Sequence, residues 1–403
     1  MLMTMDITQV FWLVIQLFFY QGLLMPAVLR LVGFLRNTSK VGSDKMPEDM
    51  GEHDYAIIVT AYGQSSQVPA VVNSLLGLDY GTFDIYVVAD NCDTSGLKFD
   101  AEKVHLLTPP VELANNVKSH AYAVSNFVRN HQRLAIIDAD NLVDSGFLHE
   151  MDRLFERGYR AVQGVRRAKN LNTTYACLDE AGDIFYRYID RKLLFEAGSS
   201  AALCGSGMAF ESDLYRSFMN DYKLSGAGFD KLLQYDIVKQ GLRIGFAEKA
   251  VVFDEKTAAT DQLVKQRARW INTWFRFWGL GLKLSLYSVK GRRSNLFFFS
   301  MMLLRPPLFL LIGFLGLALI VNILFYPWFL LLWGLAISVF IGTFLIALNY
   351  FNADRAVVNA LFKVPQFVFY QIKALFKSRR ANKLSVATAH YYDAKTSDIE
   401  HDS

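Results

Sequence analysis

Two carboxylates at the end of an apolar run are the best candidates in this sequence for binding a metal ion. Asp138 and Asp140 follow the apolar run 134–137. Carboxylates two residues apart at the exit of a strand can share a divalent cation with a phosphate or a ribose, and their oxygens suit Mg²⁺ or Mn²⁺. Because paired acids are also common in surface turns, this prediction depends on the strand that precedes them.

Asp90 lies at the end of a second apolar run, 83–91. The alternative to a binding role is a plain turn that ends the strand. At the carboxyl end of a strand, as for Asp138 and Asp140, we favour a contact with a nucleoside. The sequence has neither a GxGxxG motif nor a P-loop, so the metal and basic side chains would have to neutralise phosphates.

A loop of small residues and a single acid follow further along the chain. Gly205, Ser206 and Gly207 would let a ligand approach the backbone closely. Asp230 lies where a helix is expected to begin, after a glycine-flanked turn. It is either a functional carboxylate or an acid that the helix dipole favours in the first turn.

Gln266, Arg269 and Trp270 are spaced along the start of another predicted helix. Such a group of polar, basic and aromatic side chains could belong to a binding site. The alternative is a basic, aromatic helix that lies on a membrane surface without any binding role.

The segments that must position these residues alternate between strand and helix patterns. The expected strands are 55–62, 83–91, 104–107 and 134–140, and the expected helices are 67–78 and 117–129. Short apolar strands in β–α–β order indicate an α/β domain, Rossmann-like, with a mostly parallel sheet covered on both faces. In such sheets ligands bind at the carboxyl ends of the strands, where the acids lie.

Two long runs contain no charged residue. They cover residues 7–29 and 306–353. Since a helix needs about 20 apolar residues to cross a bilayer, the first run predicts one span and the second predicts two, broken near Pro327. A signal peptide is the alternative for the first run, which is long and has neither a basic start nor a small-residue cleavage site.

Lysine and arginine residues follow the first and last spans, whereas the loop between the last two spans has no charge. The positive-inside rule places the soluble domain and the C-terminus in the cytoplasm, in an integral protein of the inner (cytoplasmic) membrane. The stretches 271–293 and 357–377 predict amphipathic helices on the cytoplasmic leaflet. A fourth span is the alternative for the second stretch.

The composition excludes several classes of protein. Apolar residues make up 52 % of the 403 residues, too many for a disordered chain. Three cysteines without a CxxC pair exclude a disulfide scaffold. A net charge of +4 without a basic block interleaved with aromatics argues against nucleic acid as a partner.

In their order along the chain, these motifs resemble those of membrane-bound family 2 glycosyltransferases. A strand ending in Asp-Asn, a downstream lysine, Asp-Ala-Asp, Gly-Ser-Gly-Met, an acid opening a helix and Gln-x-x-Arg-Trp all lie between membrane spans. The resemblance covers residues 55–280 and is closest to the cellulose synthase-like group, which includes hyaluronan and chitin synthases. It implies a nucleotide-sugar-binding domain of the GT-A type.

The resemblance implies a role for each matching position. Asp90 would contact the uridine of a UDP-sugar, and Lys118 would lie near the nucleotide. Asp138 and Asp140 would bind the diphosphate through Mg²⁺ or Mn²⁺, and Arg269 would hold the diphosphate directly. The acceptor would be bound by Gly205, Ser206, Gly207, Gln266 and Trp270.

Asp230 would be the general base, in the place of the aspartate in the family's Thr-Glu-Asp triplet. It is preferred over Asp236 because Gly241 follows it by eleven residues, as a glycine follows the family's aspartate. The triplet here reads Gly228-Phe229-Asp230, so two of its three residues differ. Three spans are also few for a chain that must build its own polysaccharide channel.

A single base without a carboxylate nucleophile implies inversion, so an α-linked UDP-sugar would give a β-linkage. The first hypothesis is a synthase that extends a polysaccharide, with export or synthase-complex partners. The second is a non-processive transferase to a lipid-linked or other membrane acceptor, and the third is an inactive scaffold in a synthase complex.

The expected domains are an N-terminal anchor (1–40), a cytosolic GT-A domain (41–270), interfacial helices (271–304), a transmembrane hairpin (305–352) and a cytosolic amphipathic region (353–403).

Overall fold

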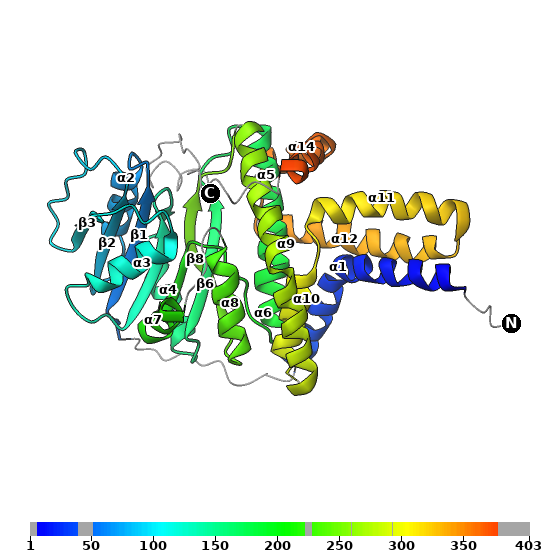
Figure 1. Ribbon diagram of the computed structural model, residues 1–403, viewed down its shortest axis with the longest axis horizontal. Coiled ribbons are helices and arrows are strands. Elements are labelled where there is room, and N and C mark those ends of the chain that lie inside the picture. The colour runs from blue at the N-terminus through cyan, green and yellow to red at the C-terminus, as the bar shows by residue number, and fades with distance from the viewer. Residues whose placement is uncertain (1–5, 39–50, 222–227, 259, 292, 378–403) are drawn as a thin grey trace.

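An α/β domain and a bundle of three long helices lie at opposite ends of the molecule (Figure 1). The computed structural model describes residues 6–38, 51–221, 228–258, 260–291 and 293–377. In this part of the chain the order of elements matches the expected one, with one candidate membrane span before the α/β domain and two after it, hereafter the spans.

An eight-stranded mixed sheet forms the centre of the α/β domain, in the order β3-β2-β1-β4-β7-β6-β8-β5. The strands are β1 (Tyr55–Tyr62), β2 (Phe83–Asp90), β3 (Val104–Leu107), β4 (Arg133–Asp138), β5 (Leu142–Val143), β6 (Ala161–Ala168), β7 (Met208–Glu211) and β8 (Ile244–Asp254). The four strands expected from the sequence are confirmed. The last of them ends at Asp138 rather than at residue 140, because the Asn141 N–H donates to the Asp138 carbonyl and closes a turn.

Strand β1 pairs in parallel with β2 on one side and β4 on the other, and β3 extends the parallel part. Four of the seven pairings in the described residues are parallel, so the expected mostly parallel sheet is confirmed. Strand β7 runs antiparallel between β4 and β6, which the sequence pattern did not predict. It places the loop before it beside the end of β4.

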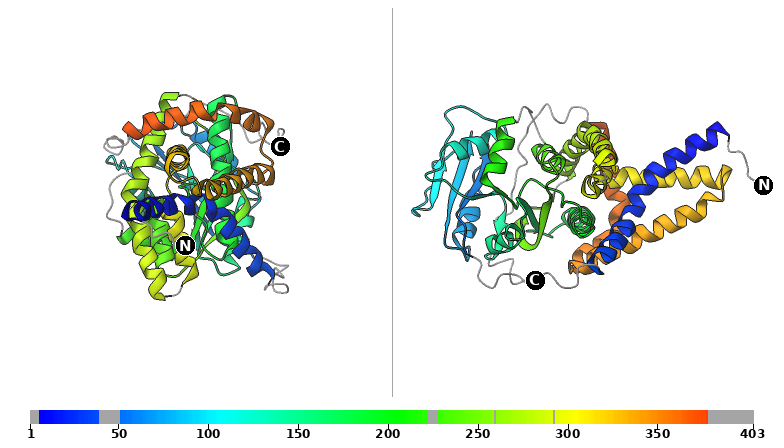
Figure 2. Two further views of the ribbon diagram at one scale, coloured as in Figure 1. Left: turned by 90° about the vertical axis from the view of Figure 1, so that its right-hand side faces the viewer. Right: turned by 90° about the horizontal axis from the view of Figure 1, so that it is seen from below.

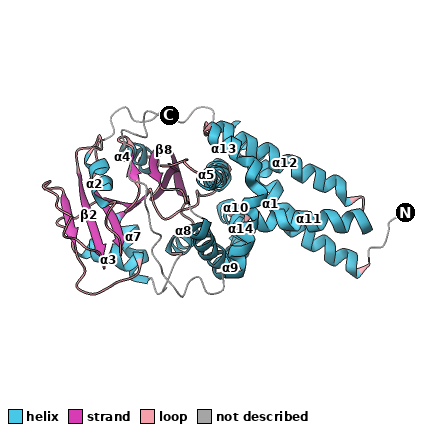
Figure 3. Cartoon of the chain, turned by 90° about the horizontal axis from the view of Figure 1, so that it is seen from above, coloured by secondary structure: helices cyan, strands magenta, loops and turns pink. Residues whose placement is uncertain are grey.

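Helices cover both faces of the sheet, as Figure 3 shows. Apolar residues of α2 (Val68–Leu76) and α4 (Phe147–Phe155) form one core with one face of the sheet. The other core involves α3 (Asn116–Ser125), α5 (Thr174–Tyr186) and α8 (Phe229–Lys239). The remaining helices of the domain are a π-helical segment (Arg187–Leu193), α6 (Leu194–Glu196) and α7 (Ser212–Asp221).

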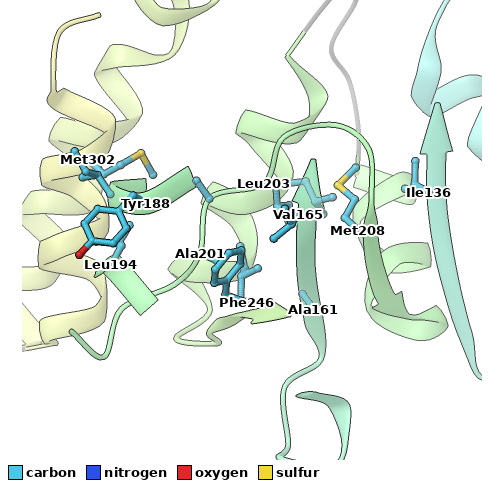
Figure 4. Packing of buried hydrophobic residues seen from close by; sticks show 14 of the residues in the cluster. Ile136, Ala161, Val165, Tyr188, Leu194, Ala201, Leu203, Met208, Phe246 and Met302 are labelled. Carbon is cyan, nitrogen blue, oxygen red and sulfur yellow. The ribbon is translucent and has the colours of Figure 1, made fainter. Parts of the chain in front are cut away.

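The second core continues from the sheet to the long helices without interruption (Figure 4). Met208 and Phe246 come from the sheet, Tyr188 comes from the π-helical segment, and Met302 comes from α10 (Ser294–Leu304). Leu29 of the first span belongs to the same cluster. The spans are therefore packed onto the α/β domain and are not merely tethered to it.

Among the described residues, three helices are long and apolar enough to cross a membrane. They are α1 (Ile7–Thr38), α11 (Leu308–Phe325) and α12 (Phe329–Tyr350). The break between the last two lies at Tyr326 and Pro327, as expected. Trp333, Ala336 and Leu311 pack with residues of α1 in a small core of the bundle.

Helix α9 (Thr260–Gly291) crosses the domain boundary that the sequence suggested at residue 270. It is one continuous helix, so the expected interfacial helix at 271–293 is the second half of a longer element. After the last span follow α13 (Arg355–Ala360), a 3₁₀ turn (Leu361–Lys363) and α14 (Val364–Lys377). The expected amphipathic stretch 357–377 is thus helical but divided.

A buried polar cluster joins the three spans. The Gln16 Oε1 atom accepts hydrogen bonds from Asn322 Nδ2 and Trp333 Nε1, both at 2.7 Å. The Trp12 Nε1 donates to Asn322 Oδ1 at 3.0 Å. In an apolar medium such side-chain hydrogen bonds hold helices together.

Replacing Gln16 by leucine is expected to destabilise the bundle by about 1 kcal/mol, since two hydrogen bonds of about 0.6 kcal/mol each are lost. Thermal unfolding in lipid nanodiscs measures the effect. Val14→Leu, on the exposed side of the same helix, is the control. An unchanged melting temperature for Gln16→Leu would show that packing alone holds the spans.

Candidate active site

The Asp-Ala-Asp turn and the small-residue loop are in direct contact. The Asp138 N–H donates to Ser206 Oγ at 3.0 Å, and Ser206 Oγ donates to Asn141 Oδ1 at 2.5 Å. Gly207 has a φ of +63°, and a Cβ there would lie 2.9 Å from a Val252 methyl group. The loop can therefore follow this path only with glycine at position 207.

Two buried glutamines hold the same loop from both sides. Gln163 of β6 donates through Nε2 to the carbonyls of Ser206 and Gly207 and accepts from the Cys204 N–H. Gln234 of α8 accepts from the Leu203 N–H at 3.0 Å. Helix α8 and the Asp-Ala-Asp turn are thus connected through the loop 203–207.

Asp230 lies in the first turn of α8, as the sequence predicts. Its carboxylate is 3.2 Å from Lys231 Nζ and 18 % exposed. Gly228 before it has a φ of +102°, and any Cβ there would overlap the ring of Phe277 on α9. This close approach places the start of α8 against α9, the helix that carries Gln266, Arg269 and Trp270.

The three candidates on α9 have different surroundings. Gln266 accepts a hydrogen bond from Thr257, just after β8, at 3.1 Å. The Trp270 ring is 46 % exposed and has the Arg267 guanidinium 4.3 Å from its centre. Arg269 is half-buried, and burial lowers the pKa of its guanidinium. The exposed part of the Trp270 ring can meet a sugar, and the Arg269 guanidinium can meet a phosphate group.

Asp90 and Asp138 lie at the same edge of the sheet. They end β2 and β4, on either side of β1. Both Asp90 oxygens accept backbone hydrogen bonds, from Leu113 at 2.9 Å and Ala114 at 2.8 Å. Asp90 therefore shapes the loop before α3, where Lys118 is exposed in the first turn.

A cleft of about 460 Å³ opens beside Asp90. Residues 89 and 91–93 line one side of it, and residues 108–112 line the other. Glu112 on this second side accepts a hydrogen bond from Tyr62, the last residue of β1, at 2.5 Å. The cleft lies at the carboxyl edge of parallel strands, where nucleotides bind in α/β sheets.

Lys169 is a site residue that the sequence argument missed. Its buried ammonium donates to the Asp140 carbonyl at 3.1 Å and to Gln67 Oε1 at 3.0 Å. Gln67 in turn donates to Glu255, which follows β8. The Asp-Ala-Asp turn is thus connected to the segments that carry Lys169, Gln67 and Glu255. The signal for Lys169 in the sequence was weak, namely a basic residue just after β6.

A second group that sequence reasoning missed is a buried charge cluster behind the loop. Oxygens of Glu180, Asp183 and Asp254 lie within 4.8 Å of one another. The Lys256 ammonium is 2.9 Å from Glu180, 2.9 Å from Asp183 and 3.0 Å from Asp254, so it supplies the positive charge that a metal would bring. Arg166 pairs with Asp254 and donates to the Cys204 carbonyl at 3.0 Å.

The charges in this cluster stabilise one another. Burial by itself would raise the pKa of Asp254, but Arg166 and Lys256 outweigh it and hold that pKa below its usual value. Burial likewise opposes the charged form of Lys256, and the surrounding carboxylates raise its pKa instead. Like Asp90 and Asp138, Asp254 ends a buried strand, and that pattern could have revealed it.

A buried histidine on α3 packs behind the start of α8. The ring of His120 contacts the ring of Phe229 at 5.4 Å, and its Nδ1 lies 2.7 Å from the Tyr215 hydroxyl. Burial lowers the pKa of His120 to about 3. Because the folded chain then binds a proton less readily than the unfolded chain, stability is complete above pH 6.5 and falls as the pH drops toward 3.

We expect His120 to lower the free energy of unfolding by about 2 kcal/mol when the pH falls from 7 to 5. His120→Gln, which keeps a hydrogen-bonding group but does not titrate, should lose that part of the pH dependence. Thermal unfolding of both proteins at the two pH values measures the difference. Equal pH dependence in the two proteins would show that His120 is not the group responsible.

A comparison with known families matches residues 53–273 to the family described as glycosyltransferase-like family 2. No curated protein sequence matches the chain. Among solved structures, the chain is similar to the mannosyltransferase PcManGT from Pyrobaculum calidifontis in complex with GDP-Man and Mn²⁺. The two are 14 % identical with a TM-score of 0.52, over 90 % of this chain and 99 % of that one.

A weaker likeness is to S. aureus TarS 1–349, with 12 % identity and a TM-score of 0.41, over 82 % of this chain and 90 % of that one. At such identities a structural likeness concerns the fold alone. The family match stands on sequence and covers more than half of the chain, including the Asp-Ala-Asp turn, the loop 203–207, Asp230 and Trp270. This chain therefore belongs to the glycosyltransferase-like family 2.

Proposed function

We propose that this protein is an inverting glycosyltransferase that extends a polysaccharide with sugar from a UDP-sugar at the cytoplasmic face of the inner membrane. The observation that supports it best is the linkage of four segments at one edge of the sheet. The loop 203–207 contacts the Asp-Ala-Asp turn through Ser206 and α8 through Gln234, and α8 begins against α9. The turn, the loop and α8 lie in the part matched to the family, as does the first part of α9 with Gln266, Arg269 and Trp270.

The chemistry assigned to these residues is a single displacement. Asp230 accepts the proton of an acceptor hydroxyl, whose oxygen then attacks the anomeric carbon from the side opposite the diphosphate. The carbon–oxygen bond to the diphosphate breaks as the new bond forms, which inverts the configuration and gives a β-linkage from an α-linked donor. Arg269 stabilises the leaving diphosphate, and Trp270 holds the acceptor ring.

Asp138 and Asp140 fit a divalent cation, because both are partly exposed carboxylates at a strand exit. Bound there, Mg²⁺ or Mn²⁺ would neutralise charge on the diphosphate. The cluster of Glu180, Asp183 and Asp254 fits less well, since the Lys256 ammonium lies among its oxygens. The presence of Mn²⁺ in the complex of the Pyrobaculum mannosyltransferase agrees with a cation in this fold.

The test uses membranes that contain the full-length protein, a panel of radiolabelled nucleotide sugars and either Mg²⁺ or Mn²⁺. GDP-mannose belongs in the panel because the Pyrobaculum enzyme was solved with GDP-Man. Long β-linked polymer from a UDP-sugar is the expected result. Turnover of GDP-mannose alone would overturn the choice of uridine, and no turnover of any donor would favour an inactive scaffold.

The second candidate is a non-processive transferase that adds one or two sugars to a lipid-linked acceptor. It is favoured by the small number of helices in the described residues that could span a membrane, which is three. Product size separates the two candidates. A radiolabelled product that extracts with lipid and carries only one or two sugars would support the second.

Replacing Lys169 by methionine is expected to weaken metal activation by about tenfold, as the loss of groups that orient metal ligands commonly does. The substitution removes the bonds to the Asp140 carbonyl and to Gln67. Donor turnover measured against Mn²⁺ concentration tests it, with the exposed Lys98→Met as the control. An unchanged Mn²⁺ dependence would mean that the turn keeps its geometry without Lys169.

A further inference from the structure

In the described part of the chain, two charged side chains line the cleft beside Asp90, and both are acidic. They are Asp93, just after β2, and Glu112, before α3. The remaining lining residues are uncharged, and residues 109–111, two prolines and a valine, form an apolar stretch. Because carboxylates repel phosphate groups, the cleft suits a flat, neutral ring better than a diphosphate.

The cleft opens at the end of the molecule that is remote from the spans. Its two sides follow β2 and β3, which are the outermost strands at one edge of the sheet. Figure 1 and the right view of Figure 2 show these strands, in blue to cyan, at one end of the molecule and the spans at the other. The cleft is therefore accessible to a soluble molecule and not to one held among the spans.

The Asp90 carboxylate holds the wall of this cleft. Asp90 is 2 % exposed, and its two oxygens accept hydrogen bonds from the Leu113 and Ala114 N–H groups. Ala114 has a φ of +45°, a left-handed conformation that alanine rarely adopts, so these bonds stabilise an unfavourable turn. Asp90 itself is not among the residues that line the cleft, although residues 89 and 91 are.

Glu112 presents a carboxylate to the cleft from a restrained segment. Its Oε1 atom accepts a hydrogen bond from the hydroxyl of Tyr62, which ends β1, at 2.5 Å. Its neighbour Leu113 is bonded to Asp90, and the two prolines at 109–110 restrict the backbone before it. The bond from Tyr62 leaves the second oxygen, Oε2, able to accept a hydrogen bond from a ligand.

A carboxylate accepts hydrogen bonds and donates none, so it distinguishes nucleobases by their ring nitrogens. Uracil presents an N3–H group and guanine presents an N1–H group, and both donate to a carboxylate. Cytosine and adenine carry a lone pair on the corresponding ring nitrogen, next to their amino group, and a carboxylate repels that lone pair. Glu112 therefore favours a base that has a ring N–H group and disfavours one that lacks it.

We propose that Glu112 selects the base of the sugar donor by accepting the ring N–H of uracil or guanine, and that Asp90 positions the wall that carries Glu112. The role as a sugar donor rests on the proposed function, which specifies uridine. Guanosine is the other nucleoside with the same hydrogen-bonding chemistry. The apolar stretch 109–111 would pack against the base, and the diphosphate would lie outside the acidic cleft.

Binding of nucleoside diphosphates tests this proposal without any transfer. UDP, GDP, CDP and ADP are titrated calorimetrically into the full-length protein in nanodiscs with Mn²⁺. We expect the wild type to bind UDP about tenfold or more tightly than CDP, since a hydrogen bond to a charged group commonly contributes that much. Glu112→Gln should reduce the preference to about threefold or less, because the glutamine amide can accept from uracil or donate to cytosine.

Two further variants separate reading of the base from structural damage. Glu102→Gln changes an exposed carboxylate before the amino end of β3, whereas the cleft lies at the carboxyl end, and should bind as wild type. Asp90→Asn loses one of the two bonds to the wall and should weaken the binding of all four diphosphates alike. If Asp90→Asn abolishes the preference for UDP over CDP while Glu112→Gln keeps it, Asp90 selects the base and the proposal is wrong.

The failure of this inference and that of the proposed function have different signatures. A preference for UDP that Glu112→Gln loses, together with no sugar transfer from any donor, would contradict the proposed function and leave the selection by Glu112 standing. Transfer from a UDP-sugar by a protein whose base preference does not change in Glu112→Gln would do the reverse. GDP bound more tightly than UDP would make guanosine the selected nucleoside, and equal or absent binding of all four diphosphates would overturn the proposal.

Discussion

Replacing Asp230 by asparagine is expected to lower the transfer rate about 10²–10⁴-fold, the usual contribution of a general base. Asparagine has nearly the same shape but cannot accept a proton from the acceptor hydroxyl. Because Asp230 lies in the first turn of α8, where the Lys231 ammonium is 3.2 Å from its carboxylate, the fold should tolerate the change. Single-turnover assays with saturating donor measure the loss in the chemical step.

The control is Asp236→Asn on the same helix. Asp236 lies six residues later, and its carboxylate accepts a hydrogen bond from Gln240 at 3.1 Å. We expect this variant to keep wild-type activity. If Asp236→Asn loses activity while Asp230→Asn retains it, Asp236 is the general base instead of Asp230. If both variants remain active, the general base does not lie on this helix.

Replacing Lys256 by methionine is expected to destabilise the protein by about 3–5 kcal/mol, the usual cost of removing one partner from a buried ion pair. The side chain is 3 % exposed and lies among Glu180, Asp183 and Asp254. Without the ammonium, the buried carboxylates of Glu180 and Asp254 and the half-buried carboxylate of Asp183 have fewer positive charges near them. Asp183 should be affected most, since Lys256 is the main charge that offsets its burial and keeps its pKa well below the usual value.

Thermal unfolding in detergent, followed by circular dichroism, measures this effect. Lys98→Met, at an exposed position, is the matched control and should change stability by less than about 0.5 kcal/mol. Lys256→Arg keeps the charge and should recover part of the loss. The Arg187 guanidinium lies 3.0 Å from Glu180. A Lys256→Met variant as stable as wild type would mean that Arg166 and Arg187 neutralise the acids without Lys256.

The strands, the spans and the order of the motifs could be predicted because each has a local pattern. The strand 55–62 is a run of apolar residues between polar segments, and the charge-free runs are long enough to be recognised alone. Asp90, Asp138 and Asp230 could be chosen as candidates because the pattern places each at the end of a strand or the start of a helix, where the structure has them. The sheet and the three candidate spans of the structure agree with these predictions.

The boundaries of elements were less predictable. The helix expected at 117–129 ends at Ser125, where the Asn126 side chain donates to the Tyr122 carbonyl. Helix α9 begins at Thr260, eleven residues before the expected interfacial helix 271–293 and six before Gln266, because Val264 and Ala268 are buried against α14. A local hydrogen bond from Asn126 ends the first helix, whereas the start of α9 depends on contacts with α14, which is distant in the sequence.

The amino-acid sequence by itself determined the class of fold, the spans and which acids end strands, since these depend on neighbours a few residues apart. Only the tertiary structure decided how the site is held. Lys169 meets Gln67 across about a hundred residues of chain, and Ser206 meets Asp138 across nearly seventy. The contact between Ser206 and Asp138 exists because β7 pairs antiparallel with β4 and brings the loop before it to the end of β4. The contact between Lys169 and Gln67 forms because a buried polar group needs a hydrogen-bond partner, even one distant in the sequence.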